Sequence, residues 1–306
     1  MIKIERGISL LIPVHNEAGN VLPLQNKIME AFDGSINDFE VIWINDASSD
    51  TTYDEIAPLC NEQTKLITNR LCIGQSQSIY EGFKISKFRI IAVIDGDGQN
   101  DPNDLIPMID LINKNEDIDF VQGKRLKRQD NFFSRVVLSK IANWLTRCLV
   151  KIEITDLGCG SKVFRREVIE AIPLRGEMHR LYAAHAAVHK FRVVEKEVSH
   201  FPRINGVSKY GLSRIFKFFF DLFFVKFHYQ IQNRPVYLFG KIAALFSLVG
   251  AIFISLSLCM KVFGVKSYVD ASLVIGGLIM FALGVISLFQ GLIADLIIRN
   301  KTNRDL

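Results

Sequence analysis

The 306-residue sequence lacks the marks of several large protein classes. No G-x-G-x-x-G follows its first predicted strand and no G-x-x-x-x-G-K-[ST] is present, which disfavours a dinucleotide fold and a P-loop. Its five cysteines are scattered without C-x-x-C spacing, so neither a disulfide framework nor a zinc site is predicted. The net charge is only +5, and no dense basic stripe with interleaved aromatic residues indicates a nucleic-acid partner.

Hydrophobic residues, by contrast, are abundant and concentrated near the C-terminus. They make up 49% of the sequence, and the mean hydropathy is +0.21. Residues 242–260 and 271–294 contain no charge, and each is long enough to cross a hydrocarbon core of about 30 Å. We predict two transmembrane helices joined by the short link 261–270. Flanking basic residues outnumber those of the link, which places both helix ends in the cytoplasm.

Three parts of the chain follow from this pattern: a cytoplasmic domain at 1–209, a juxtamembrane segment at 210–234 and a membrane hairpin with a short tail at 235–306. The juxtamembrane segment mixes phenylalanine with basic residues, which is typical of a helix in the membrane interface, although a core helix can share this composition. The N-terminus has too short an apolar core for a signal peptide. We therefore expect a multi-pass protein of the cytoplasmic (inner) membrane. Two spans form a small bundle, which favours a homo-oligomer.

The first hundred residues alternate between short branched apolar runs and helix-like stretches. This alternation predicts an α/β domain with a parallel sheet, because right-handed crossovers return the chain in the same direction. Polar clusters follow three of the strands, in PVHNEA, NDASSD and DGDGQNDP, and they should meet at the carboxyl edge of the sheet. Strands are predicted at 8–14, 39–46, 65–69 and 89–95, and helices near 19–32, 50–62 and 74–87.

The acidic turn IDGDGQNDP, residues 94–102, is the densest of these clusters. An EF-hand loop would need glycine at its sixth position and a carboxylate at its twelfth, where the sequence has Asn100 and Ile106. A few carboxylates at a strand end instead favour Mg²⁺ or Mn²⁺, which complete their oxygen shell with substrate phosphates. We expect the cation to hold a diphosphate, and we expect Asp101 with Pro102 to cap the following helix.

These motifs resemble those of family 2 glycosyltransferases, enzymes of the Rossmann-like GT-A fold that use nucleotide sugars. LGCGSKVFRREV, MHR and RINGVSKYG, followed by two spans, are similar to one branch, the polyprenyl-phosphate glycosyltransferases. That branch includes dolichyl-phosphate mannose synthase and bacterial enzymes acting on undecaprenyl phosphate. The resemblance covers roughly residues 8–300 and implies a GT-A sheet domain, mixed but mainly parallel, followed by interfacial and transmembrane helices.

The resemblance also implies a donor site. Asn45 and Ala47 depart from the family, which often has aspartate and glycine there, so the nucleotide is less determined; similarity to the bacterial branch favours UDP over GDP. The implied nucleotide-sugar residues are Pro13, Glu17, Asp46, Asp95, His179 and Arg180, and the implied ligands of Mg²⁺ or Mn²⁺ are Asp95, Asp97 and Gln99.

A polyprenyl phosphate acceptor needs cationic groups near the bilayer. If 134–150 is a helix, Arg135, Ser139, Asn143 and Arg147 form a polar stripe along it, and arginine suits a phosphate. Arg203, Ser208 and Lys209 could meet both the leaving group and the acceptor, although a solvated basic loop at 124–128 and lipid anchoring by Lys209 are simpler alternatives. The acceptor-phosphate residues predicted in this way are Arg125, Arg135, Ser139 and Ser208.

The predicted reaction is displacement at the anomeric carbon by a phosphate oxygen, with inversion. A phosphate monoester has a second pKa of about 6, so a strong base is not required. Asp156 matches the family's acidic residue near the reacting centre, where it either orients the acceptor or acts as a base. The predicted catalytic residues are Asp97, Asp156, Arg203 and Lys209.

The predicted product is a lipid-phosphate sugar that serves as a donor for cell-envelope glycan or lipopolysaccharide modification. A processive synthase is excluded because neither Trp43 nor Trp144 lies in a Q-x-x-R-W motif. The alternative is a non-catalytic, membrane-anchored scaffold that binds sugar nucleotides.

Overall fold

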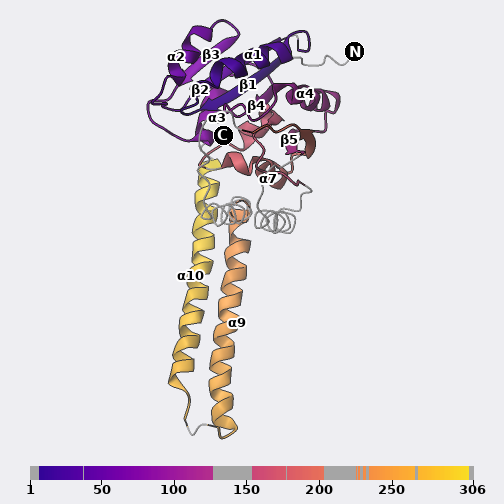
Figure 1. The fold of residues 1–306 in the computed structure, drawn as a ribbon. Helices are drawn as coiled ribbons and strands as arrows, with labels where there is room; N and C mark the ends of the chain where they lie inside the picture. The colour runs from indigo at the N-terminus through magenta and orange to yellow at the C-terminus, as the bar shows by residue number, and fades with distance from the viewer. Residues whose placement is uncertain are drawn as a thin grey trace. The chain divides into compact units, whose positions relative to one another are not determined.

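The structure is a computed structural model of the chain. It divides into two compact units, Met1–Val225 and Lys226–Leu306 (Figure 1). The predicted helix 134–150 and most of the predicted interfacial segment 210–234 lie outside the described residues. The structure describes residues 7–36, 38–126, 154–176, 178–202, 225, 227, 230–231, 234–265 and 268–302.

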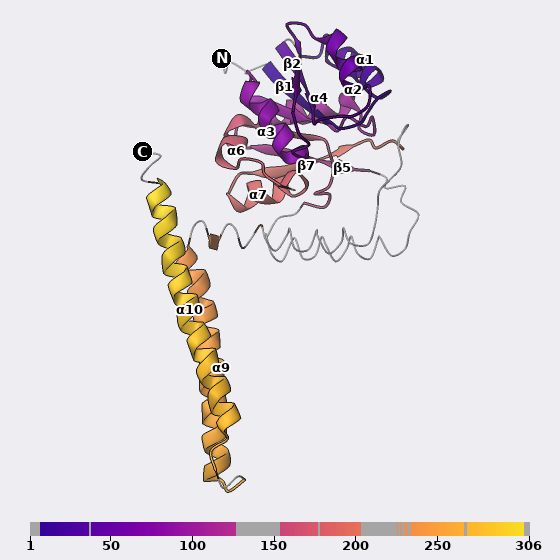
Figure 2. The same cartoon turned by 90° about the vertical axis from the view of Figure 1, so that its left-hand side faces the viewer.

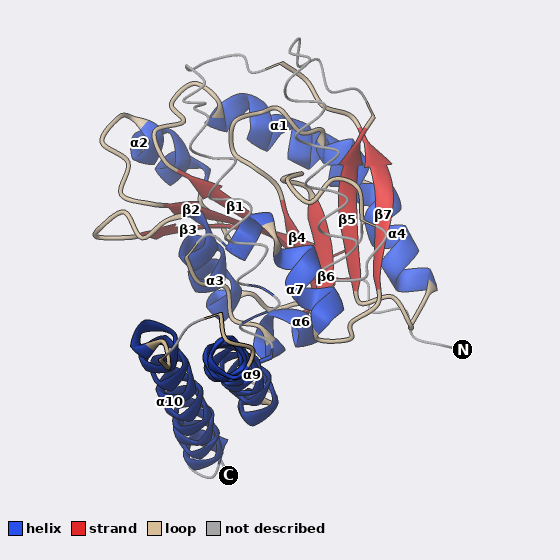
Figure 3. Cartoon of the chain, turned by 90° about the horizontal axis from the view of Figure 1, so that it is seen from below, coloured by secondary structure: helices blue, strands red, loops and turns tan. Residues whose placement is uncertain are grey.

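A sheet of seven strands forms the centre of the described part of the first unit, in the order β3-β2-β1-β4-β6-β5-β7 (Figure 3). β6 runs antiparallel to β4 and β5, whereas the other pairs of neighbours are parallel. The predicted GT-A-like sheet, mixed but mainly parallel, is thereby confirmed. The strands are β1 (Gly7–Val14), β2 (Asp38–Asn45), β3 (Thr64–Thr68), β4 (Ile90–Val93), β5 (Phe120–Arg125), β6 (Lys162–Arg165) and β7 (Val193–Val198).

Helices cover both faces of the sheet, because alternate side chains of each strand point to opposite sides. Leu10 and Trp43 pack in one core with α1, α2 and α4. Leu11 and Ile42 pack in the second core with α3, α6 and α7. The helices are α1 (Val21–Phe32), α2 (Thr52–Ile56), α3 (Gln75–Ile85), α4 (Leu105–Lys114), α6 (Arg166–Ala171) and α7 (Tyr182–Val188), with short 3₁₀ turns η1 (Ala57–Leu59), η2 (Pro102–Asp104) and η3 (Met178–Arg180).

The predicted elements of the first hundred residues agree with this fold, with one exception. The helix predicted near 50–62 is shorter, because Pro58 lacks an N–H and its ring clashes with the preceding turn, so α2 gives way to η1. The prediction for Asp101 is confirmed, since its side chain accepts a hydrogen bond from the Asn103 N–H at 3.0 Å and caps η2. Strands β5, β6 and β7 were not predicted.

The second unit contains two helices long and apolar enough to cross a membrane, α9 (Pro235–Val262) and α10 (Ala271–Thr302) (Figure 2). They pack closely: a Cβ on Gly250 would lie 2.6 Å from the carbonyl oxygen of Gly277. Large apolar side chains such as Leu248 and Ile279 are exposed, as expected for lipid-facing positions. Small residues recur at every seventh position along the buried seam: Ala243, Gly250 and Ser257 on α9, and Gly277, Gly284 and Gly291 on α10.

Candidate active site

A cavity of about 300 Å³ lies at the carboxyl edge of the sheet. The ends of β1, β2 and β4 and the loops that follow them supply Pro13, Asp46 and Asp95. β5 ends at this edge with Arg125, and antiparallel β6 begins there with Lys162. Residues far apart in the sequence therefore meet around one cavity, as the polar clusters at the strand ends predict.

Nine of the predicted site residues line this cavity, and the antiparallel part of the sheet adds others. Lys162 was not predicted as a site residue. The feature that could have identified it is a lysine directly before the apolar pair Val163 and Phe164, at the start of β6. The nine residues are Pro13, Glu17, Asp46, Asp95, Asp97, Gln99, Arg125, His179 and Arg180. The quoted loops also supply His15 and Asn100, and Gln75, Lys162 and His200 are polar lining residues from beyond those loops. Arg135, Ser139, Arg203, Ser208 and Lys209 lie outside the described residues, so their roles stay predictions.

Asp95 faces the cavity, and its carboxylate is enclosed from two sides. Gln75 Nε2 donates to Oδ1 at 2.7 Å, and a Cβ on Gly160 would lie only 2.0 Å from Oδ2. Burial raises the pKa of Asp95 and the charge of Asp97 raises it further, while the charge of Lys162 lowers it. A carboxylate in this setting gains from a nearby cation.

The acidic turn offers oxygen atoms that fit a divalent cation. The Gln99 N–H donates to Asp97 Oδ1 at 3.1 Å, and Gln99 Nε2 donates to the Phe201 carbonyl at 3.3 Å, which leaves the amide oxygen for another partner. No three His, Cys, Asp or Glu side chains among the described residues form a metal cluster. The donor set is thus two carboxylates and one amide, an open set of the kind that lets Mg²⁺ or Mn²⁺ take further ligands from water and phosphates.

Asp156 does not line the cavity but lies behind Arg125. Arg125 Nε donates to Asp156 Oδ2 at 2.7 Å and Nη2 donates to Oδ1 at 2.8 Å, while the Arg125 backbone N–H also contacts Oδ2 at 3.2 Å. Glu195 in β7 accepts a hydrogen bond from the Asp156 N–H at 2.9 Å and so holds the loop. This bidentate pair fixes the guanidinium at the cavity wall.

Ser76 at the start of α3 orients His179. The His179 backbone N–H donates to Ser76 Oγ at 2.9 Å, and the same oxygen lies 2.9 Å from His179 Nδ1. The hydroxyl can donate its proton to Nδ1 of a ring protonated on Nε2, or accept a second hydrogen bond from Nδ1–H. In the first of these tautomers, His179 Nε2 is a hydrogen-bond donor.

Asp46 both lines the cavity and organises the loop that leads into α3. Its carboxylate accepts hydrogen bonds from Asn69 Nδ2 at 3.0 Å, from the Ile73 N–H at 2.9 Å and from the Gly74 N–H at 2.8 Å. Burial raises the pKa of Asp46, but these hydrogen bonds outweigh it and hold the pKa below its usual range. Asp46 is therefore ionised and rigid at neutral pH.

The sequence of this chain is similar to a family model and to several known proteins. Residues 9–172 match the model of "Glycosyl transferase family 2". The dodecaprenyl-phosphate galacturonate synthase of Rhizobium johnstonii is 33% identical over 240 residues, 77% of this chain and 71% of that protein. The undecaprenyl-phosphate 4-deoxy-4-formamido-L-arabinose transferase of Aeromonas hydrophila is 28% identical over 301 residues, 97% of this chain and 90% of that protein.

Solved structures agree on the fold. Glucosyl-3-phosphoglycerate synthase from Mycobacterium tuberculosis, in complex with Mn²⁺ and uridine-diphosphate-glucose, superposes with a TM-score of 0.55 at 13% identity, covering 72% of this chain and 79% of that one. Its complex with phosphoglyceric acid gives a TM-score of 0.57 at 14% identity, over 73% and 80% of the two chains. The family model, the identity to the Rhizobium protein and the sheet topology lead to one conclusion: the chain belongs to glycosyl transferase family 2, and the relatives named here are polyprenyl-phosphate glycosyltransferases.

Proposed function

We propose that the protein is a membrane-bound, inverting glycosyltransferase that moves a sugar from a UDP-linked donor to a polyprenyl phosphate, with undecaprenyl phosphate as the acceptor. The product would be a lipid-phosphate sugar used to modify a cell-envelope glycan or lipopolysaccharide. The observation that carries this proposal is the cavity that brings Asp95 and Asp97 together with Arg125. Relatives named for transfer to dodecaprenyl and undecaprenyl phosphate support the acceptor class.

The donor half of the cavity is assigned to the nucleotide diphosphate. Asp97 and Gln99, with Asp95 beside them, would hold Mg²⁺ or Mn²⁺, and the Mn²⁺ complex of a fold neighbour supports a metal at this kind of site. A bound divalent cation supplies positive charge that stabilises the leaving diphosphate. We assign His179 Nε2–H to a hydrogen bond with the donor phosphate or sugar, since Ser76 fixes the ring.

The acceptor half is assigned to Arg125. Its guanidinium is held by Asp156, and both carboxylate oxygens accept hydrogen bonds from it. Of the two roles open to Asp156, this pairing favours orientation of the acceptor-binding arginine over proton abstraction. A phosphate oxygen with a second pKa near 6 is already a competent nucleophile, so positioning and charge neutralisation supply most of the catalysis.

The membrane arrangement completes the proposal. α9 and α10 would anchor the chain in the cytoplasmic membrane as a hairpin, with the catalytic unit in the cytoplasm, and two such spans favour a homo-oligomer. The segment 210–234 would lie in the interface, and Arg135, Ser139, Arg203, Ser208 and Lys209 would bind the lipid phosphate and the leaving group there.

The test is product formation by the purified full-length chain in detergent with undecaprenyl phosphate, Mn²⁺ or Mg²⁺, and a panel of UDP- and GDP-sugars. We expect one nucleotide sugar to give a mild-acid-labile lipid product on thin-layer chromatography, together with release of the nucleoside diphosphate. A matched reaction without undecaprenyl phosphate, in which water is the only acceptor, separates transfer to the lipid from hydrolysis of the nucleotide sugar. Nucleotide-sugar binding without any lipid product across the panel would instead favour the non-catalytic scaffold.

A further inference from the structure

Lys162 is a charged residue that the fold encloses beside the proposed metal ligands. It is the first residue of β6, paired with Val93 on β4 and with Gln122 on β5. Only 6% of its surface is exposed, and it lines the cavity. Its ammonium group donates to the Cys159 carbonyl oxygen, which leaves two further protons for other partners.

The Asp95 carboxylate lines the same cavity, and its charge interacts with that of this ammonium. The loop that carries Gly160 separates Cys159 from Lys162 along the chain, and it presses on Asp95 so closely that no Cβ fits at 160. The two charges influence each other: burial lowers the pKa of Lys162 while Asp95 raises it, and the charge of Lys162 in turn lowers the pKa of Asp95.

The charges around Asp95 do not balance in the absence of a ligand. In their ionised forms Asp95 and Asp97 contribute two negative charges and Lys162 one positive charge, so that these three side chains together carry a single net negative charge. Arg125 is paired with Asp156, and Glu17, Asp46 and Arg180 also line the cavity. A divalent cation alone would leave an excess of positive charge in a poorly solvated place, which a diphosphate removes.

We propose that Lys162 is a positioning and charge-balancing residue of the donor site, one that makes binding of the divalent cation depend on binding of the nucleotide diphosphate. This inference rests on the proposed function. Lys162 would hold Asp95 in place before the donor arrives and would share the charge of the diphosphate afterwards. With an uncharged residue at position 162, Asp95 and Asp97 would bind the cation without a nucleotide.

The test is Mn²⁺ affinity of the full-length chain, measured by electron paramagnetic resonance of free Mn²⁺ at mildly alkaline pH, with and without UDP or GDP. For the unaltered chain we expect the nucleotide that binds to tighten Mn²⁺ binding by about tenfold, within the usual range of coupling between two sites. For Lys162→Met we expect Mn²⁺ alone to bind at least about threefold tighter, since the repelling charge is gone, and the nucleotide effect to shrink by a similar factor.

Two variants separate this role from a merely structural one. Lys162→Arg keeps the charge and should retain weak Mn²⁺ binding and strong coupling. Lys65→Met removes a partly buried lysine from the other end of the same sheet, where it pairs with Glu40 at 2.7 Å, and should leave the Mn²⁺ coupling unchanged. Unfolding followed by tryptophan fluorescence reports any loss of stability in each variant.

The opposite result would overturn the inference. If Lys162→Met binds Mn²⁺ more weakly than the unaltered chain, or keeps the full nucleotide effect, Lys162 has no charge-balancing role. If the unaltered chain binds no Mn²⁺ with either nucleotide, the proposed donor site itself fails, and the inference fails with it. Mn²⁺ binding that depends on Asp97 but not on Lys162 leaves the proposed function intact and contradicts this inference alone.

Discussion

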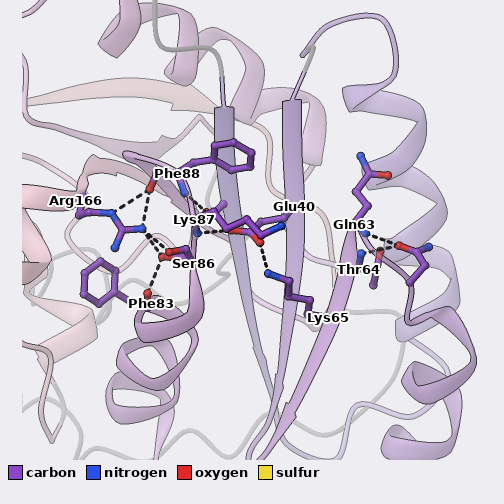
Figure 4. A network of polar contacts seen from close by, with 11 residues as sticks. Glu40, Gln63, Thr64, Lys65, Phe83, Ser86, Lys87, Phe88 and Arg166 are labelled. Atoms are coloured by element: carbon purple, nitrogen blue, oxygen red, sulfur yellow. Dashed lines mark hydrogen bonds and ion pairs between the residues drawn. The ribbon is translucent and has the colours of Figure 1, made fainter.

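Each end of the sheet holds an acidic side chain that is at least partly buried, and the two side chains differ in their hydrogen-bond partners. At the amino end, Glu40 accepts hydrogen bonds from Ser9 Oγ at 2.7 Å, from Lys65 Nζ at 2.7 Å and from the Lys87 N–H at 2.6 Å (Figure 4). At the carboxyl end, Asp95 accepts a hydrogen bond from Gln75 and lies beside another carboxylate.

The pKa values of the two groups express this difference. Burial raises the pKa of Glu40, but its hydrogen-bond donors outweigh burial and lower the pKa overall. Burial and a like charge leave the pKa of Asp95 raised. Glu40 has the set of partners that a structural carboxylate needs, whereas the raised pKa of Asp95 fits the metal-ligand role proposed for it. The comparison teaches that burial alone does not identify a functional acid; its partners do.

Replacing Asp97, the carboxylate beside Asp95 at the carboxyl end, should have the largest effect on activity. We expect Asp97→Ala to reduce turnover by about 100-fold or more, because charge stabilisation at the leaving group is lost. Membrane insertion and unfolding temperature should be preserved. The assay is lipid-product formation, with Asp110→Ala as control, since Asp110 is exposed and pairs with Lys114 on the surface of α4. Undiminished turnover would remove the metal role from Asp97.

Replacing the acid of the amino end should affect stability instead. We expect Glu40→Ala to lower the free energy of unfolding by about 2–3 kcal/mol, because buried donors lose their acceptor while Lys65 can still reach water. Tryptophan fluorescence during urea unfolding measures the decrease in the free energy of unfolding. Activity per folded molecule should stay unchanged, and a large fall in turnover without a fall in stability would contradict the structural role.

The same carboxylate should make stability depend on pH. Because the pKa of Glu40 is lower in the folded chain than its ordinary value of about 4.5, its contribution is present above that value and is lost as the pH falls through the folded pKa. The difference in unfolding free energy between the unaltered chain and Glu40→Gln should therefore shrink on acidification below about pH 4.5. A difference that grows on acidification would contradict a lowered pKa of Glu40 in the folded chain.

Backbone strain at the carboxyl edge of the sheet should have the smallest effect. Ala47, in the loop after β2 at the carboxyl edge, has φ 53°, and Asn16 in the neighbouring loop has φ 56°. We expect Ala47→Gly to stabilise the chain by about 0.5–1 kcal/mol, since glycine adopts positive φ without a steric penalty. Thermal unfolding measures this gain. Asn16→Gly is the comparison variant and should gain less, because asparagine tolerates this conformation better than alanine.

Much of the fold was predictable because the signals are local. The strand runs 8–14 and 39–46 and the spans 242–260 and 271–294 are recognisable from hydrophobic pattern and length alone. β6 was not predictable in the same way. It has four residues, and its antiparallel direction depends on pairing with two strands that are distant in sequence.

The candidate site likewise has a part that was predictable from local sequence and a part that was not. The acidic turn and Glu17 could be proposed from motifs, since the residues of each motif are close in sequence. The pairing of Arg125 with Asp156 joins positions 31 apart, and that of Ser76 with His179 joins positions 103 apart. Neither follows from spacing, because spacing does not state which loops fold against each other.

The sequence by itself determined the types of the main elements, the carboxylates of the acidic turn and the two apolar helices, because side-chain chemistry and hydrophobic period act over a few residues. Only the tertiary structure decided which acids are satisfied and which face a cavity. Whether Glu40 or Asp95 awaits a cation depends on donors supplied by distant strands and loops. Lys162 lines the same cavity as Asp95 for the same reason, since an antiparallel strand begins where its parallel neighbours end.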